Sequence, residues 1–138
     1  MSEFSKRMVA VMNEKIEPGK AMNALAHMCM GLGAAVGKEQ LNLMDYVDAD
    51  QGVHPNISKM LLVVLKANSS KIAKVREDAR SQSMSFADFT DTMTVGTWSE
   101  QKERTFQTKQ DALVYYGIML FGEKDAVTEL TRKFSLWK

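Results

Sequence analysis

The sequence predicts an α/β fold in one domain, residues 1–138, with a four-stranded, mostly mixed sheet and helices on both faces. Apolar runs of strand length alternate along the chain with segments of helical periodicity, and turn or capping residues separate many of them. Such alternation is typical of sheets that are covered by helices. A chain of 138 residues also has the size of one domain with a single core.

The first third of the chain predicts a strand, a helix and a hairpin turn. Residues 8–13 form a short apolar strand candidate, and the turn at 17–19 leads through Pro18 into a helix over 19–36. Residues 48–52, Asp-Ala-Asp-Gln-Gly, resemble the start of a calcium loop. A lysine, Lys59, stands where that loop needs its closing glutamate, so we expect a hairpin turn instead.

The middle of the chain predicts two strands joined by a helix. Residues 60–65 are a continuous aliphatic run, as expected for a central strand that is covered on both faces. Asn68-Ser69-Ser70 supplies helix-capping residues for a helix over 70–82. A third strand follows at 84–89, with Thr90-Asp91-Thr92 at its end.

The last third predicts a strand and a final helix. The polar segment 98–110 is expected to be a loop or a short surface helix, and 112–121 gives the fourth strand. Gly122 is expected to form a turn. The inner side of the last helix is expected to hold Val127, Leu130, Thr131 and Phe134.

Composition excludes several classes of protein. The net charge of +1 is too small for a domain that coats nucleic acid through bulk electrostatics, and no apolar run approaches the ~18 residues that span a bilayer. Residues 1–7 lack the apolar stretch of a secretory signal, and Cys29 is the only cysteine, so no internal disulfide forms. Two histidines and one cysteine lack metal-ligand spacing. We therefore expect a cytoplasmic protein with no membrane contact, metal or cofactor.

A polar stripe on the first predicted helix marks a candidate site. Lys20, Asn23 and His27 fall within about 60° of one another on a helix that is otherwise largely apolar. Lys20 lies in the first turn, where the helix dipole disfavours a cation. Ligands of α/β proteins bind where strands hand over to helices. The stripe therefore predicts a binding or catalytic site.

The ends of the predicted strands extend this site. If the first three strands run in the same direction, their carboxyl ends lie at one edge of the sheet, beside the Lys20 end of the stripe. The polar residues expected at that edge are Asn13, Asn68, Asp88, Thr90, Asp91 and Thr92.

Several of these residues resemble the motifs of type II peptidyl-tRNA hydrolases. The matching positions are the run Val9-Ala10-Val11-Met12-Asn13, Gly19-Lys20, His27, Asp88, Thr92 and Gly96-Thr97. Ala24, Phe89-Thr90 and Met93 replace residues of that family, and about fifteen extra residues occupy roughly 98–112. In these features the chain is similar to the bacterial domain-of-unknown-function family two thousand, which shares the hydrolase fold. The resemblance covers nearly the whole chain.

The resemblance implies a role for each candidate residue. In the hydrolases, water attacks the ester that joins a peptide to the terminal ribose of tRNA. Asp88 would then position or activate the water, Lys20 would stabilise the developing negative charge or a phosphate, and Thr92 would add a hydroxyl. The substrate-binding candidates are Asn13, Asn23, His27, Asn68, Thr90 and Asp91. The implied partner is the acceptor end of tRNA or a small ligand.

Structural roles for the same residues stay open. The stem of Lys20 can lie along the helix with its amine in water, and Asp88 can cap the turn that follows its strand. His27 is expected to be a hydrogen-bonded interior histidine, and Asn13 and Asn23 can satisfy backbone groups.

Three functions remain as hypotheses. The first is hydrolysis of peptidyl-tRNA or a related aminoacyl ester. The second is a non-catalytic module that binds a small anionic or amide-bearing ligand on the same fold. The third is a protein whose surfaces serve partner binding, because the first helix is rich in the eleven methionines of the chain. The same helix predicts a homodimer.

Overall fold

A computed structural model describes residues 4–138. Residues 1–3, which belong to the segment considered for a secretory signal, lie outside the described residues. In chain order, the helices and strands are β1 (Lys6–Asn13), α1 (Pro18–Val36), β2 (Leu43–Val47), β3 (Val53–Ser58), β4 (Leu62–Ala67), α2 (Ser69–Ser81), β5 (Ser85–Thr90), α3 (Trp98–Gln107), β6 (Tyr115–Glu123), α4 (Lys124–Thr131) and β7 (Ser135–Leu136). Two short 3-10 turns, η1 (Asp91–Met93) and η2 (Gln110–Ala112), flank α3.

The main sheet is mixed and has five strands in the order β5-β6-β1-β4-β7. β1 is parallel to β4 and antiparallel to β6, which is itself antiparallel to β5. β1, β4 and β5 therefore run in the same direction, and their carboxyl ends share one edge. The expected count of four strands is wrong, because β7 adds a fifth. With only two residues, Ser135–Leu136, this strand is too short to give a recognisable sequence pattern.

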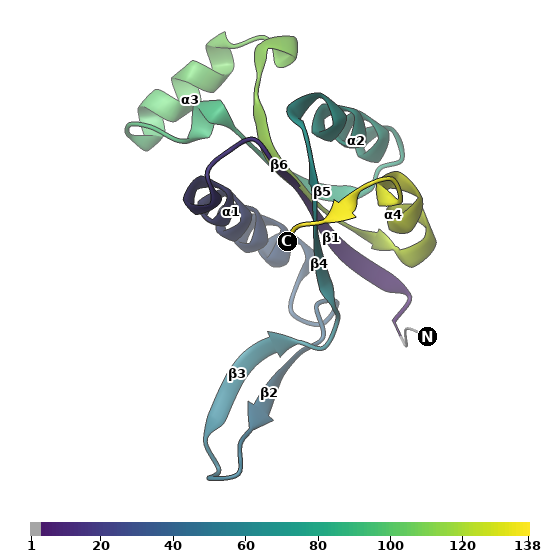
Figure 1. The fold of residues 1–138 in the computed structure, drawn as a ribbon. Helices are drawn as coiled ribbons and strands as arrows, with labels where there is room; N and C mark the ends of the chain where they lie inside the picture. The colour runs from purple at the N-terminus through teal and green to yellow at the C-terminus, as the bar shows by residue number, and fades with distance from the viewer. Residues whose placement is uncertain (1–3) are drawn as a thin grey trace.

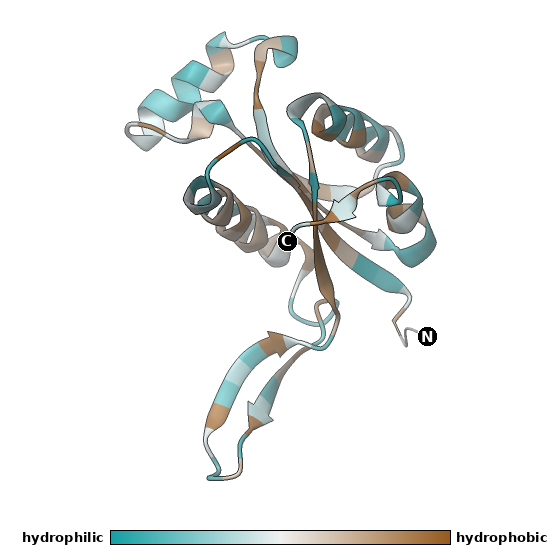
Figure 2. Cartoon of the chain, in the orientation of Figure 1, coloured by the Kyte–Doolittle hydropathy of each residue, from teal (hydrophilic) through white to brown (hydrophobic). Residues whose placement is uncertain are grey.

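Helices cover both faces of the sheet, as the sequence predicts (Figure 1). Successive side chains of a strand point to opposite faces, so β1 serves two cores. Met8, Ala10 and Met12 pack in the core beneath α1. Val9 and Val11 pack in the core beneath α2 and α4. Figure 2 shows the resulting hydrophobic band along the central strands.

The first helix is less buried than its composition suggests. Its buried residues are Ala21, Ala24, Met28 and Leu32. Met22 and Met30 are each 65% exposed. α1 is a single layer on its side of the sheet (Figure 1), so its outer side meets solvent although it is rich in apolar residues. Among residues 4–138, no helix has the length and apolar character needed to cross a membrane.

The aliphatic run at 60–65 is not a central strand covered along its whole length. β4 begins two residues later, at Leu62, and Leu61 is 82% exposed. On its outer side, β4 pairs with β7 only at Leu65 and Lys66. Hydropathy alone does not distinguish a strand inside a sheet from one that lies beside a very short edge strand.

The turn expected at Gly122 is also wrong. Gly122 lies inside β6, opposite Arg7 of β1. α4 begins at Lys124, directly after the last residue of β6, so the chain needs no separate turn. Phe134 lies beyond the end of α4 but still packs against the core on that side of the sheet, together with Leu130.

The expected hairpin turn at 48–52 joins β2 to β3, and residues 43–58 form a two-stranded arm that extends away from the main sheet (Figure 1). The Asp48 carboxylate organises the turn. Its Oδ1 accepts hydrogen bonds from the backbone N–H groups of Asp50 and Gly52, both at 2.9 Å. Its Oδ2 lies 2.7 Å from Nε2 of His54.

Candidate functional site

The shared edge of β1, β4 and β5 gathers most of the polar residues that the sequence predicts there. Asn13 is the last residue of β1, Asn68 directly follows β4, and Thr90 ends β5. Asp91 and Thr92 lie in the turn that follows Thr90. In the structure, these side chains bind mainly to neighbouring parts of the protein.

Asn13 is buried, and both polar atoms of its side-chain amide form hydrogen bonds. Its Nδ2 donates to the carbonyl of Tyr115 at 2.8 Å, and its Oδ1 accepts from the backbone N–H of Lys15 at 2.8 Å. The side chain thus joins the end of β1 to the start of β6. This arrangement supports the structural interpretation of Asn13.

Asn68 and Asp91 also stabilise the backbone. Asn68 caps α2, and its Oδ1 accepts from the backbone N–H of Lys71 at 3.0 Å. Oδ1 of Asp91 accepts from the backbone N–H of Val114 at 3.1 Å, while its own N–H donates to the Val114 carbonyl at 2.9 Å. The Asn68 carboxamide and the Asp91 carboxylate therefore fix the backbone just after β4 and β5, beside the site.

Three threonine hydroxyls form a chain that attaches α3 to this edge. Oγ1 of Thr92 lies 2.7 Å from Oγ1 of Thr90 and 2.8 Å from Oγ1 of Thr105. Thr92 is only 4% exposed. Arg104 adds hydrogen bonds to the carbonyls of Thr92 and Val95, at 3.1 and 3.0 Å. Because α3 has no buried residue, these polar contacts are what hold it.

Asp88 and Lys20 lie on opposite faces of the sheet. Oδ2 of Asp88 accepts a hydrogen bond from Nε of Arg76 in α2, and the same guanidinium stacks on Phe86. Lys20 lies in α1, which packs on the other face. The structure thus separates the two residues to which the resemblance assigns catalysis.

The Lys20 side chain lies at the protein surface. Its side chain is 58% exposed, and its ion pair with Glu17 is long, with 3.7 Å between Nζ and Oε1. A surface pair of this kind contributes little to stability. The amine is therefore available to an anionic group at the beginning of α1.

The rest of the polar stripe borders a cavity of about 650 Å³ between α1, β5 and α3. Its lining residues are Asn23, His27, Met28, Gly31, Ala87, Asp88, Phe89, Met93, Thr94, Trp98 and Gln101. His27 is exposed rather than interior, and its ring lies 5.6 Å from that of Phe89, centroid to centroid. Phe89 in turn lies 6.1 Å from Tyr116. The expectation of an interior, hydrogen-bonded His27 is wrong, because α1 turns this edge toward solvent.

The cavity offers amide groups and aromatic rings. In the part of the chain that the structure describes, the Asn23 side chain has no hydrogen-bond partner, whereas Gln101 donates through Nε2 to the Gly96 carbonyl at 3.2 Å. The oxygen of Gln101 and the whole amide of Asn23 are therefore free to bind a ligand. Trp98 is 74% exposed and supplies a flat apolar surface on which a ring can stack, whereas the Phe89 ring is almost fully buried.

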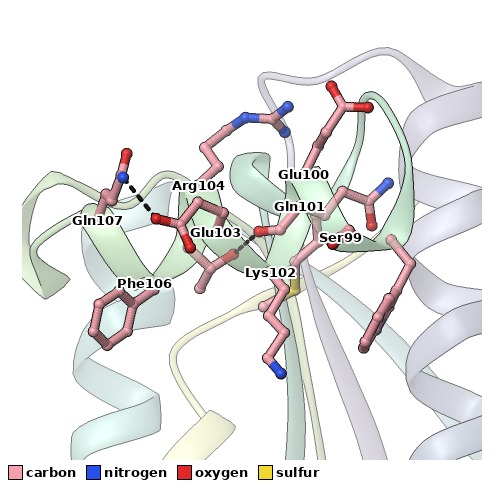
Figure 3. A pocket seen from close by; sticks show the side chains of 11 residues that line it. Ser99, Glu100, Gln101, Lys102, Glu103, Arg104, Phe106 and Gln107 are labelled. Atoms are coloured by element: carbon pink, nitrogen blue, oxygen red, sulfur yellow. Dashed lines mark hydrogen bonds between the residues drawn. The ribbon is translucent and has the colours of Figure 1, made fainter.

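A second, larger hollow surrounds the exposed side of α3 (Figure 3). Its volume is about 1320 Å³, but one helix and Met93 provide its entire lining, so it is an open surface rather than a closed site. Phe106 and Lys102 point to the same side of the helix in Figure 3. The ammonium of Lys102 also lies 5.3 Å from the ring centroid of Trp98.

Some residues of the site were not identified from the sequence. No motif in the sequence marks Arg76 as a site residue, and Trp98 and Gln101 lie in the segment expected to be a loop or short surface helix. The capping box formed by Thr97 and Glu100 is a sequence signal that marks the start of α3. It also indicates that Trp98 and Gln101 share one side of a helix.

No group of three potential metal-ligating side chains gathers anywhere within residues 4–138. The single cysteine, Cys29, is half-buried in α1, and burial raises the pKa of its thiol. Its Sγ lies 3.8 Å from Sδ of Met119. A raised pKa keeps the thiol protonated, which disfavours a nucleophilic role.

Together, the fold and the site define an α/β protein with an open cavity between its first helix, an edge strand and an inserted helix. The chain belongs to the family described as "Protein of unknown function (DUF2000)", whose profile matches residues 6–138. No curated protein matches the chain. A solved structure of the protein of unknown function Atu0240 from Agrobacterium tumefaciens strain C58 is similar, with a TM-score of 0.85 and 15% sequence identity. The similarity covers 98% of this chain and 99% of that one, and it supports the fold.

Proposed function

We propose that the cavity between α1, β5 and α3 binds a small molecule that carries a planar ring and an amide, and that Lys20 binds an anionic group of that molecule. The observation that carries this proposal is that the free amide of Asn23 and the exposed ring of Trp98 line one open cavity. Amide groups recognise amides through paired donors and acceptors, and aromatic rings stack on planar ligands.

The position of Lys20 supports the anionic part of the ligand. Lys20 precedes Asn23 by three residues on the same side of α1, which places it about 4.5 Å further along the helix axis. The cavity lining includes one ionisable acid, Asp88, whose carboxylate pairs with Arg76 on the other face. A ligand with its ring in the cavity and a negative charge near Lys20 would fit this distribution of charge.

We also propose that the fold is that of the type II peptidyl-tRNA hydrolases. Support comes from the motif residues at the beginning of α1 and the end of β5, and from a mixed sheet in which β1 and β4 are parallel and β6 is antiparallel.

Hydrolysis of peptidyl-tRNA or a related aminoacyl ester is a second candidate function. One observation favours it: Oδ1 of Asp88 has no hydrogen-bond partner within residues 4–138, although Oδ2 is held by Arg76. That oxygen could orient a water molecule. The separation of Asp88 from Lys20 by the sheet argues against a single catalytic centre that contains both residues.

The binding proposal is tested by titration of the full chain with three probes. Puromycin joins a purine-type ring to an amide-linked amino acid, adenosine lacks the amide, and adenosine 5′-monophosphate adds a phosphate. We expect puromycin to bind more tightly than adenosine, and Asn23→Ala to remove most of that difference. We expect the monophosphate to bind more tightly than adenosine, and Lys20→Ala to abolish that preference. If none of the probes binds at millimolar concentration, the proposed ligand class is wrong.

The hydrolase candidate needs a separate measurement. Turnover of labelled peptidyl-tRNA is followed for the wild type, Lys20→Ala and Asp88→Asn, with circular dichroism to verify that each variant is folded. Loss of activity in both folded variants would support hydrolysis. An inactive wild type, beside an active reference hydrolase, would exclude this candidate and leave the binding proposal unaffected.

A further inference from the structure

Within residues 4–138, the arm formed by residues 43–58 pairs with no other strand. β2 and β3 pair with each other, and within residues 4–138 neither hydrophobic core includes any residue of the arm. Figure 1 shows the arm extending beyond the sheet and all its helices. An isolated two-stranded hairpin is at best marginally stable in water. Contact with a further surface would therefore stabilise the arm.

Both sides of the arm carry exposed apolar side chains. Tyr46, Val47, Val53 and Ile57 are each at least half exposed. Val47 pairs with Val53 across the strands, and Ile57 pairs with Met44. Leu61 and Leu62, which follow the arm in the chain, are also exposed, because β7 pairs with β4 only at Leu65 and Lys66. Exposed apolar side chains gathered on one element in this way are typical of an interface.

Charge is distributed unevenly along the arm. Residues 43–58 contain three aspartates, Asp45, Asp48 and Asp50, and no lysine or arginine, although the whole chain has a net charge of +1. The base carries two exposed lysines, Lys38 and Lys59, with Glu39 as the opposing charge. The arm is thus acidic toward its tip and more basic at its base.

We propose that the arm binds the arm of a second copy of this chain, with the two arms antiparallel about a twofold axis. In that arrangement the acidic tip of one arm lies beside Lys38 and Lys59 of the other, and the apolar side chains on one side of each arm, Ile57 among them, face each other. A twofold interface requires a surface that is complementary to itself, and an arm with opposite charges at its two ends meets that requirement.

This arrangement differs from a dimer through α1, which the methionines of that helix predict. The exposed Met22 and Met30 offer an apolar surface without the complementary charges of the arm. The two interfaces are distinguished by substitutions, because no residue of the arm lies in α1. The proposal also stands apart from the binding cavity, so its test does not depend on any ligand.

Sedimentation velocity of the full chain between about 1 and about 100 µM tests the proposal, since specific homodimers commonly dissociate in or below this range. We expect a dimer for the wild type. Ile57→Asp should weaken association at least about tenfold, because it places a charge within the apolar contact. Phe106→Asp removes an aromatic side chain that is 85% exposed on α3, and it should leave the dimer unchanged.

Exchanging two charges tests the dimer separately from any effect of a substitution on the folding of the arm. Lys59→Asp and Asp50→Lys should each weaken the dimer several-fold, and the double variant should recover most of the wild-type affinity. Circular dichroism verifies that each variant is folded. A wild type that stays monomeric at about 100 µM would overturn the proposal and leave the arm to a different protein. A dimer that dissociates in Met22→Asp but not in Ile57→Asp would also overturn it, in favour of α1.

Discussion

Arg76 and Asp88 form a partly buried ion pair that joins α2 to β5, with 2.5 Å between Nε and Oδ2. The two side chains are 24% and 15% exposed. The pair lies on the face of the sheet that α2 covers, with the guanidinium also against Phe86. Asp88 thus has a structural role in this chain that is independent of any chemistry near Lys20.

We predict that Arg76→Ala destabilises the protein by about 1–3 kcal/mol, because it leaves the Asp88 carboxylate partly buried without its partner. Asp88→Asn should cost less, since the amide oxygen can still accept from the guanidinium. Chemical denaturation of both single variants and of the double variant measures the coupling between them. Additive losses would show that the pair contributes nothing beyond each residue alone.

The threonine chain predicts a local effect on α3. Thr105→Val keeps the shape of the side chain but removes the hydroxyl that bonds to Thr92 and to the carbonyl of Gln101. We expect a loss of about 1 kcal/mol and faster hydrogen exchange at residues 98–107. Thr108→Val is a useful comparison, because within residues 4–138 the hydroxyl of Thr108, the residue after α3, bonds only to the Arg104 carbonyl. Equal exchange in the two variants would contradict this role of Thr105.

Substitution of His27 should affect binding without affecting stability. The His27 side chain is exposed, and its ring contact with Phe89 lies at the border of the cavity. We therefore expect His27→Ala to weaken puromycin binding about tenfold and to change the free energy of unfolding by less than about 0.5 kcal/mol. Isothermal titration and thermal unfolding measure the two quantities. A large loss of stability would instead indicate a structural role for the ring.

The strands and helices that the sequence predicts correctly are those with a clear hydrophobic periodicity or a capping signal. β1, α1, α2 and β5 lie within about two residues of their expected bounds, because apolar repeats and the cap at Asn68 are local signals. By contrast, the presence of β7 and the exposure of the outer side of β4 follow from the order of strands in the sheet. Local sequence does not encode that relationship.

The candidate site likewise combines features that have a local sequence signal with features that depend on tertiary arrangement. The stripe of Lys20, Asn23 and His27 follows from helical geometry, and the structure keeps it on one side of α1. The separation of Lys20 from Asp88 depends on the register of β5 and on Arg76, which lies twelve residues before Asp88 in a different element. Trp98 and Gln101 reach the cavity because α3 packs against the turn that follows β5, an arrangement that a polar segment does not reveal.

The arm should lose its order at low pH. Hydrogen bonds from His54 and from the backbone of Gly52 and Asp50 lower the pKa of Asp48. A lowered pKa stabilises the folded arm above the ordinary pKa of an aspartate, about 3.9, and this stabilisation is lost as the pH falls through the lowered value. We expect amides of residues 48–54 to lose protection below about pH 4, while β1 stays protected. NMR-detected exchange over this range measures both.

Asp48→Asn is the corresponding variant. Its amide cannot carry the charge, so protection of the arm should become independent of pH in that range and weaker at neutral pH. An unchanged pH profile in this variant would assign the titration to another group.

Gly117 gives the last prediction, because its position in β6 leaves no room for a side chain. A Cβ there would lie 2.6 Å from Sδ and 2.9 Å from Cε of Met12, and 3.0 Å from Cε of Met28. Both methionines are buried between the sheet and α1, so they cannot move toward solvent. We expect Gly117→Ala to destabilise the protein by about 1–3 kcal/mol. Adding Met12→Leu, whose side chain is shorter, should restore part of that loss, and denaturation curves measure both variants.

Gly31→Ala is the comparison, since a Cβ at Gly31 meets no atom within 4 Å. Within a helix, that change should stabilise the protein by up to about 1 kcal/mol. If the two alanines had the same effect, packing around Met12 would not be the cause.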